Sequence, residues 1–217
     1  MSSLLSIQVG LPRSYGHEGA TDPFDRPWRT GFFKEPVSGP VQLTTTGLVG
    51  DGVADSRWHG GPEMAVLAYS ADHYPLWRAE TGLDSMGPGG FGENLTLEGM
   101  AESDVCIGDV FAVGQVRVQV SVPRAPCRHI DRRWRKVGLC DASRSNGRVG
   151  WYCRVLETGT LSAGQEVRLL ERPLPQWTVS EVHEVRHHRK EDLVAAASLA
   201  SCDLLSGEWR DYFAQRL

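Results

Sequence analysis

The chain has 217 residues, 41% of them hydrophobic, and a formal net charge of −4. This length suits one medium domain with a small appendage, and the acidic balance argues against a dedicated nucleic-acid-binding protein. No apolar run approaches the roughly 20 residues that a membrane helix needs. Five cysteines without tight spacing indicate reduced thiols, which predicts a cytoplasmic protein.

Short strands separated by glycine-rich turns dominate the first 170 residues. Strands are expected at 4–9, 37–43, 64–69, 95–97, 110–113, 115–122, 151–156 and 167–170, with Asn146–Gly147 as a hairpin turn before the strand at 151. A helix is expected from Ser70 to about Thr81, where Gly82 ends it. The pattern predicts a mainly β fold with added helices, arranged as a closed or nearly closed β-barrel.

The composition changes at Pro173 and Pro175, which indicate a linker. Thr178 and Glu181 form a capping box, and helical spacing follows in three segments up to Leu217. We therefore predict a barrel domain over residues 1–172 and a small three-helix unit over residues 173–217. His183 and His187 are spaced to share a helix face, but without a third ligand a solvated face is favoured over a metal site.

Cys127 is the leading candidate for chemistry. Alternating valines at 116, 118, 120 and 122 predict a strand with one buried face, and two prolines then end it just before Cys127. A helix should follow, with Ile130, Trp134 and Val137 on one face. The surrounding cations and the helix start favour a thiolate, which is a nucleophile and a soft metal ligand. The alternative is a small apolar core residue.

Three other motifs carry weaker signals. Gly87–Gly92 matches G-x-G-x-x-G, yet it lacks the preceding strand and following helix of a nucleotide-binding loop. Cys127, His129 and Cys140 suggest zinc, but their spacing fits no common zinc site. His59–Gly60–Gly61 combines an imidazole with glycines that let a ligand approach the backbone, a pattern that also occurs in ordinary turns.

Five motifs occur in a fixed order and together resemble the MOSC domain, named for the C-terminal region of molybdenum cofactor sulfurases. They are Lys34–Val37, Gly50–Gly52, His59–Gly61, Phe91–Leu95 and Pro123–Cys127. The resemblance is strongest to the YiiM-type branch, which carries a small all-α appendage. It departs from the family's pattern at Val53–Ala54, where a more polar residue is expected.

The resemblance implies a barrel that binds the molybdenum–molybdopterin cofactor, with Cys127 as catalytic residue and molybdenum ligand. The pocket should be lined by Lys34, His59, Gly60, Gly61, Asn94, Arg124 and Arg128. It further implies reduction of N-hydroxylated compounds with electrons from a separate flavoprotein reductase. A homodimer is left open, and no pyridoxal phosphate, nucleic acid or membrane partner is expected.

Two rival functions stay open at this point. In the first, Cys127 carries a persulfide as a cofactor or sulfur carrier, without turnover of N–OH compounds. In the second, the protein is a non-enzymatic binding module that docks an acidic partner through the cations of Arg132–Lys136.

Overall fold

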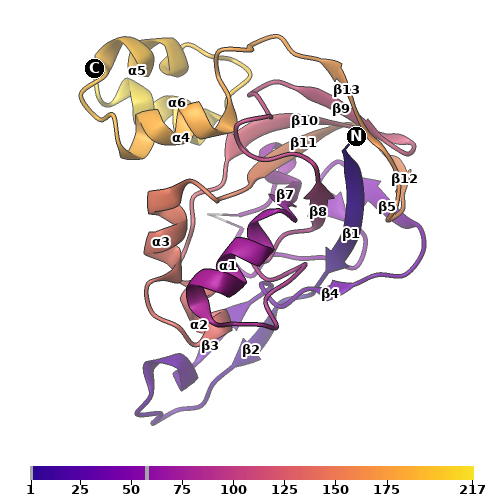
Figure 1. Ribbon diagram of the computed structural model, residues 1–217, viewed down its shortest axis with the longest axis vertical. Helices are drawn as coiled ribbons and strands as arrows, with labels where there is room; N and C mark the ends of the chain where they lie inside the picture. The colour runs from indigo at the N-terminus through magenta and orange to yellow at the C-terminus, as the bar shows by residue number, and fades with distance from the viewer. Residues whose placement is uncertain (1, 57–58) are drawn as a thin grey trace.

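The computed structural model describes residues 2–56 and 59–217, and a large mixed sheet forms the body of the protein (Figure 1). This eight-stranded sheet has the order β13-β9-β10-β11-β7-β8-β1-β4, with only β7 and β8 parallel. Its strands are β1 (Ser3–Val9), β4 (Glu35–Pro36), β7 (Val66–Ser70), β8 (Leu95–Glu98), β9 (Val110–Val113), β10 (Val116–Pro123), β11 (Trp151–Glu157) and β13 (Val167–Glu171). The expected mainly β body with added helices is confirmed.

The two ends of this sheet meet. The N–H of Leu4 donates to the carbonyl of Gln165 at 2.9 Å, and the N–H of Gly164 donates to the carbonyl of Leu4 at 2.7 Å. Ser3 also forms an isolated antiparallel bridge with Glu166, just before β13 begins. The sheet is therefore nearly closed, through a short stretch of backbone bonds in place of a full ladder.

Smaller sheets complete the β structure. β5 (Val41–Thr44) pairs with β6 (Gly47–Leu48) and β12 (Gly159–Leu161), while β2 (Arg13–Tyr15) pairs with β3 (Trp28–Thr30). Two short 3-10 turns, η1 (Pro23–Asp25) and η2 (Pro62–Met64), lie in the loops. The strand expected over 37–43 begins only at Val41. Val37 lies before this strand, and its N–H donates to the carbonyl of Ile7 on β1 at 2.9 Å.

The strand predicted from alternating valines is β10. Val116, Val118, Val120 and Val122 are all buried in the main core. Between them Arg117 is exposed, whereas Ser121 is buried where the register shifts against β11. β10 pairs with β9 on one side and β11 on the other, so it lies well inside the sheet.

Three helices are inserted into this body: α1 (His73–Thr81), α2 (His129–Trp134) and α3 (Leu139–Asn146). The prediction that Val137 extends the helix after Cys127 was wrong, since α2 ends where Arg135 takes a left-handed φ of 49° and Val137 is 77% exposed. The hairpin at Asn146–Gly147 was also wrong. Gly147, at φ 74°, is the left-handed cap that ends α3, a second role for which glycine is favoured.

The C-terminal helices are α4 (Val179–His187), α5 (Leu193–Ala200) and α6 (Gly207–Ala214), which gather at one end of the sheet (Figure 1). Thr178 caps α4 by accepting the N–H of Glu181 at 3.0 Å, as expected. Val179, Val182 and Val185 belong to the same apolar core as the sheet valines. The division at residue 172 falls between β13 and α4, and it stays a prediction.

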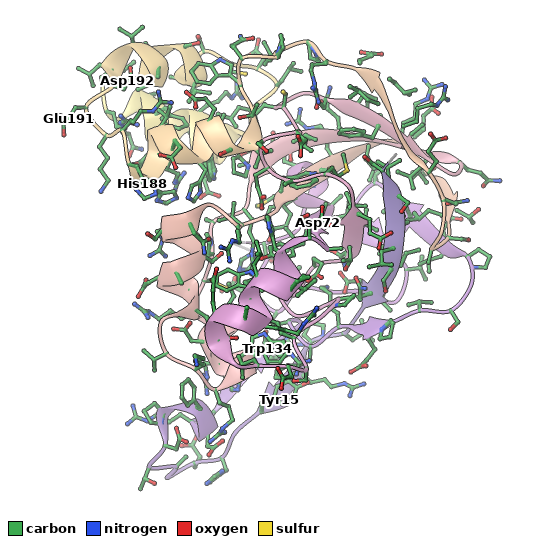
Figure 2. The ribbon with its side chains drawn as sticks, in the orientation of Figure 1. Tyr15, Asp72, Trp134, His188, Glu191 and Asp192 are labelled. Carbon is green, nitrogen blue, oxygen red and sulfur yellow. The ribbon has the colours of Figure 1, made fainter. Side chains whose placement is uncertain are left out.

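His183 was expected on a solvated face, and that expectation was wrong. Its side chain is fully buried, and its Nε2 lies 2.7 Å from the carbonyl of Arg144 on α3. The ring of His187 is 4.5 Å away, whereas His188, labelled in Figure 2, is exposed. His183 therefore joins the three-helix unit to α3 of the body.

The glycine-rich loop Gly87–Gly92 folds around a buried carboxylate. Glu93 accepts the N–H of Gly89 at 2.7 Å and of Phe91 at 3.1 Å, and also bonds the hydroxyls of Tyr74 and Thr96. The loop's own N–H groups are thus directed at Glu93, which agrees with setting it aside as a nucleotide-binding loop. Among residues 2–56 and 59–217, no helix is long and apolar enough to cross a bilayer.

The buried histidines predict a specific acid sensitivity. Burial and the nearby His183, Arg186 and Arg144 lower the pKa of His187 to about 3. The unfolded chain takes up a proton near pH 6.5 while the folded chain does not, so stability falls as the pH falls below 6.5. Between pH 7.5 and pH 5, the wild type should lose about 1 kcal/mol more unfolding free energy than His187→Gln does. The expected difference is kept small because solvent screens a partly exposed ring.

Urea titrations of the wild type and the variant at the two pH values provide the measurement. The exposed His17 supplies the control, because His17→Gln should leave the pH dependence as it is in the wild type. Equal pH dependence for wild type and His187→Gln would contradict the prediction.

Candidate functional site

A cavity of about 970 Å³ lies at the end of β10. It is lined by Cys127 and by all of the expected cofactor-binding residues except Arg128, namely Lys34, His59, Gly60, Gly61, Asn94 and Arg124. These residues come from four separate parts of the sequence. The fold therefore brings most of the predicted set around one space.

Arg124 and Cys127 lie in the short segment between β10 and α2. Cys127 is half-buried, and its carbonyl accepts the N–H of Ile130 at 3.1 Å as the chain turns into α2. Arg124 is only 3% exposed, and its guanidinium carbon lies 5.7 Å from the centre of the Phe32 ring. Its Nη1 is buried and has no hydrogen-bond partner among the described residues. A buried donor of this kind is suited to an anion.

The backbone around Arg124 is held by a second buried carboxylate. The N–H of Arg124 donates to the carbonyl of Gly150 at 3.0 Å, and the N–H of Gly150 donates to Glu102 at 2.7 Å. Glu102 also accepts the N–H of Val149 and contacts His73 at 2.6 Å. This chain of bonds fixes the backbone from which the guanidinium projects.

Lys34, Asp51 and Asn94 form a buried polar cluster in the cavity wall. Lys34 bonds Asp51, and the amide of Asn94 donates to the other carboxylate oxygen at 2.8 Å. The Asn94 amide also donates to the carbonyl of Gln8 and accepts the N–H of Leu67. Burial lowers the pKa of Lys34, while Asp51 and Glu93 act in the opposite direction. Asn94 thus holds Asp51 in place, and Asp51 holds the ammonium group.

His59 begins the glycine motif on another side of the cavity. Burial and the Arg124 charge lower the pKa of His59, which favours a neutral imidazole. Gly60 and Gly61 have φ values of 79° and 80°, which explains the glycines by conformation. A Cβ on Gly61 would meet no atom within 4 Å. Arg57 and Trp58, which precede this motif, lie outside the described residues.

Arg128 points away from the cavity, contrary to the expectation that it lines the pocket. Its side chain is 66% exposed, and it lies 3.3 Å from Asp131 and 3.4 Å from Asp141. The helix that begins one residue later carries its side chain outward, toward α3. Its guanidinium therefore interacts with aspartates of α2 and α3 at the surface.

The remaining cations of this segment contact other parts of the molecule, and Lys136 donates to the carbonyl of Thr81 at 2.8 Å. Arg132 donates to the carbonyl of Phe24 at 3.2 Å, and Arg135 bonds Asp25 at 2.5 Å and Asp22 at 2.6 Å. Arg133 lies over the Phe33 ring at 4.5 Å, and Phe33 stacks on Tyr15. Figure 2 shows Tyr15 near Trp134, far from the C-terminal helices. These cations are engaged within the molecule, which weakens the acidic-partner hypothesis.

The zinc alternative finds no support in the geometry. His129 lines the cavity, with its Nδ1 3.4 Å from the Thr30 hydroxyl and its ring 5.0 Å from Trp28. Cys140 is buried, and burial raises the pKa of its thiol. Over residues 2–56 and 59–217, no three side chains of His, Cys, Asp or Glu form a metal-binding group.

Some cavity residues were not predicted. Asp51 lies within the Gly50–Gly52 motif but was not expected to line the pocket. Tyr152 follows the first residue of β11, where a strand pattern says nothing about a cavity. Glu208 and Trp209 come from α6 in the C-terminal unit, and no local signal links them to the barrel.

The protein thus combines a nearly closed sheet with a cavity that contains a cysteine and is suited to an anion. Residues 55–168 match the model of the MOSC domain, and residues 177–217 match that of the "YiiM-like, 3-alpha helix domain". The chain therefore belongs to the MOSC domain family, which is associated with the molybdenum cofactor, and carries the YiiM-like helical unit. The resemblance inferred from the five motifs is confirmed.

Several relatives extend over most of the chain. "Uncharacterized protein YflK" of Bacillus subtilis is 36% identical and covers 99% of this chain and 94% of its own length. "Protein YiiM" of Escherichia coli is 34% identical over 81% of this chain and 79% of its own. A protein named "Reductase" from Gibberella moniliformis is 40% identical over 81% of this chain, which spans only 31% of that protein.

Solved structures agree with these relationships. The crystal structure of YiiM from Geobacillus stearothermophilus has a TM-score of 0.83 with 30% identity, and each chain is fully covered. That of YiiM from Escherichia coli has a TM-score of 0.75 with 28% identity, covering 97% of this chain and 92% of its own. The three-helix unit is thus shared together with the sheet.

The Lys34–Asp51 pair predicts a strong stability effect. Both side chains are about nine-tenths buried, so Asp51→Asn leaves an ammonium group without its counter-charge. We expect this variant to lose about 3 kcal/mol of unfolding free energy, measured by urea titration. Adding Lys34→Met should recover about half of the loss, because the uncompensated charge is then gone. Additive losses in the double variant would contradict the pairing argument.

Proposed function

We propose that this protein binds the molybdenum cofactor in the cavity and reduces N-hydroxylated compounds, taking electrons from a separate flavoprotein reductase. One observation carries the proposal. A half-buried thiol, Cys127, lines the same cavity as Arg124, whose buried Nη1 has no partner among the described residues. The shared family supports the cofactor, and the relative named "Reductase" is consistent with the direction of the reaction.

The residues fit such a cofactor. A pterin phosphate is an anion, and a guanidinium that is buried without a partner gains most from an anion placed beside it. A cysteine thiolate is a soft ligand of the kind that heavier metals prefer. Lys34 already has Asp51 as partner, so it contributes hydrogen bonds more than net charge. The cavity volume of about 970 Å³ is within the range of cofactor sites.

When bound, the cofactor supplies two-electron redox chemistry at molybdenum. This chain's residues then have separate tasks: Cys127 supplies a sulfur ligand and Arg124 holds the anionic end. His59, kept neutral by burial and by Arg124, can donate one hydrogen bond and accept another. In balance, the N–OH compound, two electrons and two protons give the N–H compound and water. The electrons come from the flavoprotein reductase.

The cysteine provides the direct test. Cys127→Ser should lower N–OH reduction at least about a hundredfold and lower the molybdenum content, because serine lacks the sulfur donor. Molybdenum is measured by elemental analysis of protein made in a cofactor-producing host, and turnover with a supplied flavoprotein reductase. Cys202→Ser is the matched control, since Cys202 is also half-buried but lies outside the cavity.

Full activity and metal content in Cys127→Ser would sink the assignment. A cold-cyanide assay separates the rival function. Thiocyanate released from the wild type, absent in Cys127→Ser and unaccompanied by N–OH turnover, would identify a sulfur carrier in place of a reductase.

A further inference from the structure

Helix α6 of the C-terminal unit forms part of the cavity. Glu208 and Trp209 line it, although they lie about 80 residues after Cys127 in the sequence. The match to the MOSC domain ends at residue 168, so this part of the wall comes from the appended helices. The cavity is thus built in part from two segments of the chain that match different family models.

The start of α6 is fixed on the strand that leads to the cysteine. The N–H of Ser206 donates to the carbonyl of Ser121 on β10 at 3.0 Å. The N–H of Gly207 donates to Glu63 at 3.1 Å, and Glu63 also bonds Arg154 on β11. Trp209 is buried in the main core. Glu208, which follows these anchors, therefore has a defined place at the cavity.

The carboxylate of Glu208 is available to a ligand. It is exposed, and it forms no hydrogen bond or ion pair with any residue in 2–56 or 59–217. Asp51, another cavity carboxylate, is taken by Lys34 and Asn94, and Asp55 also has a partner. The nearby Arg186 stacks on the rings of Trp209 and Tyr212, at 4.1 Å from each, and its charge interacts with Glu208 without a hydrogen bond or ion pair between them.

Tyr152 lines the same cavity as Glu208, Arg124 and Cys127. Burial raises the pKa of Tyr152 to about 12, Arg124 acts against that, and Cys127, Asp51 and Glu208 add to it. One phenol is therefore within electrostatic range of the cysteine, the arginine and the α6 carboxylate. The cavity has a cationic wall at Arg124 and an anionic edge at Glu208.

We infer that Glu208 is a specificity-determining residue that recognises N-hydroxylated substrates bearing a cationic amidine- or guanidine-type group. The inference rests on the proposed function, since it names the substrate class of that same site. A planar cation with two parallel N–H donors matches the two oxygens of a carboxylate. Without Glu208 such a substrate would lose this carboxylate partner, whereas a neutral substrate would not be affected.

Binding of product-like probes tests the inference without turnover. Benzamidine is a planar cation, and benzamide is its neutral counterpart of almost the same shape. We expect Glu208→Gln to weaken benzamidine binding about fivefold by calorimetry, with benzamide unchanged. The matched control is Asp211→Asn, which removes one charge from the same helix at an exposed position outside the cavity. This variant should leave the binding of both probes as in the wild type.

Turnover separates this inference from the proposed function. In the metal-loaded protein, Glu208→Gln should raise KM for an N-hydroxyguanidine about fivefold with kcat unchanged, and leave KM for a hydroxamic acid as in the wild type. If the wild type shows no N–OH turnover but Glu208→Gln still weakens benzamidine binding and not benzamide binding, the reductase function is rejected and Glu208 remains a site for cations. Equal effects on both probes, no effect on either, or no benzamidine binding to the wild type would overturn the inference.

Discussion

The buried guanidinium of Arg124 is the constraint on which the rest of the site depends. A cation removed from water costs several kcal/mol unless an anion or full hydrogen bonding replaces the solvent, and its Nη1 has no partner among the described residues. The backbone of Arg124 is nevertheless held in place, because its N–H bonds Gly150, and Gly150 in turn bonds the carboxylate of Glu102. A rigid, incompletely satisfied cation is what a site for an anionic ligand requires before the ligand arrives.

The sheet explains why the cation and the thiol stay together. β10 buries its valines, and its end, Val122 and Pro123, is paired with β11. Pro123 at the end of the strand and Pro126 just before Cys127 restrict the backbone on either side of Arg124. The C-terminal unit adds to this by bonding Ser206 to Ser121 on the same strand. The helical unit is thus part of the cavity's construction as well as an attachment to its surface.

How much the sequence predicted depends on whether the signal was local. The alternating valines of β10 and the Thr178 cap were read correctly because each requires only neighbouring residues. Val137 was misplaced because the left-handed turn at Arg135, a non-glycine residue, leaves no sequence signal. Asn146–Gly147 was misread because glycine at positive φ serves both hairpins and helix ends. Asp51 and Glu208 were missed because their roles arise from contacts between distant segments.

The distribution of charge also bears on the rival functions. The cluster after Cys127 looked like a docking surface in the sequence, but Arg132 and Arg135 bind the β2–β3 hairpin and its aspartates. Inside the cavity, the buried Nη1 of Arg124 has no partner among the described residues, and at the cavity edge Glu208 is exposed. A buried cation without an anion beside it favours a site that takes a small ligand with an anionic end. Cys127 lines the same space as both charges.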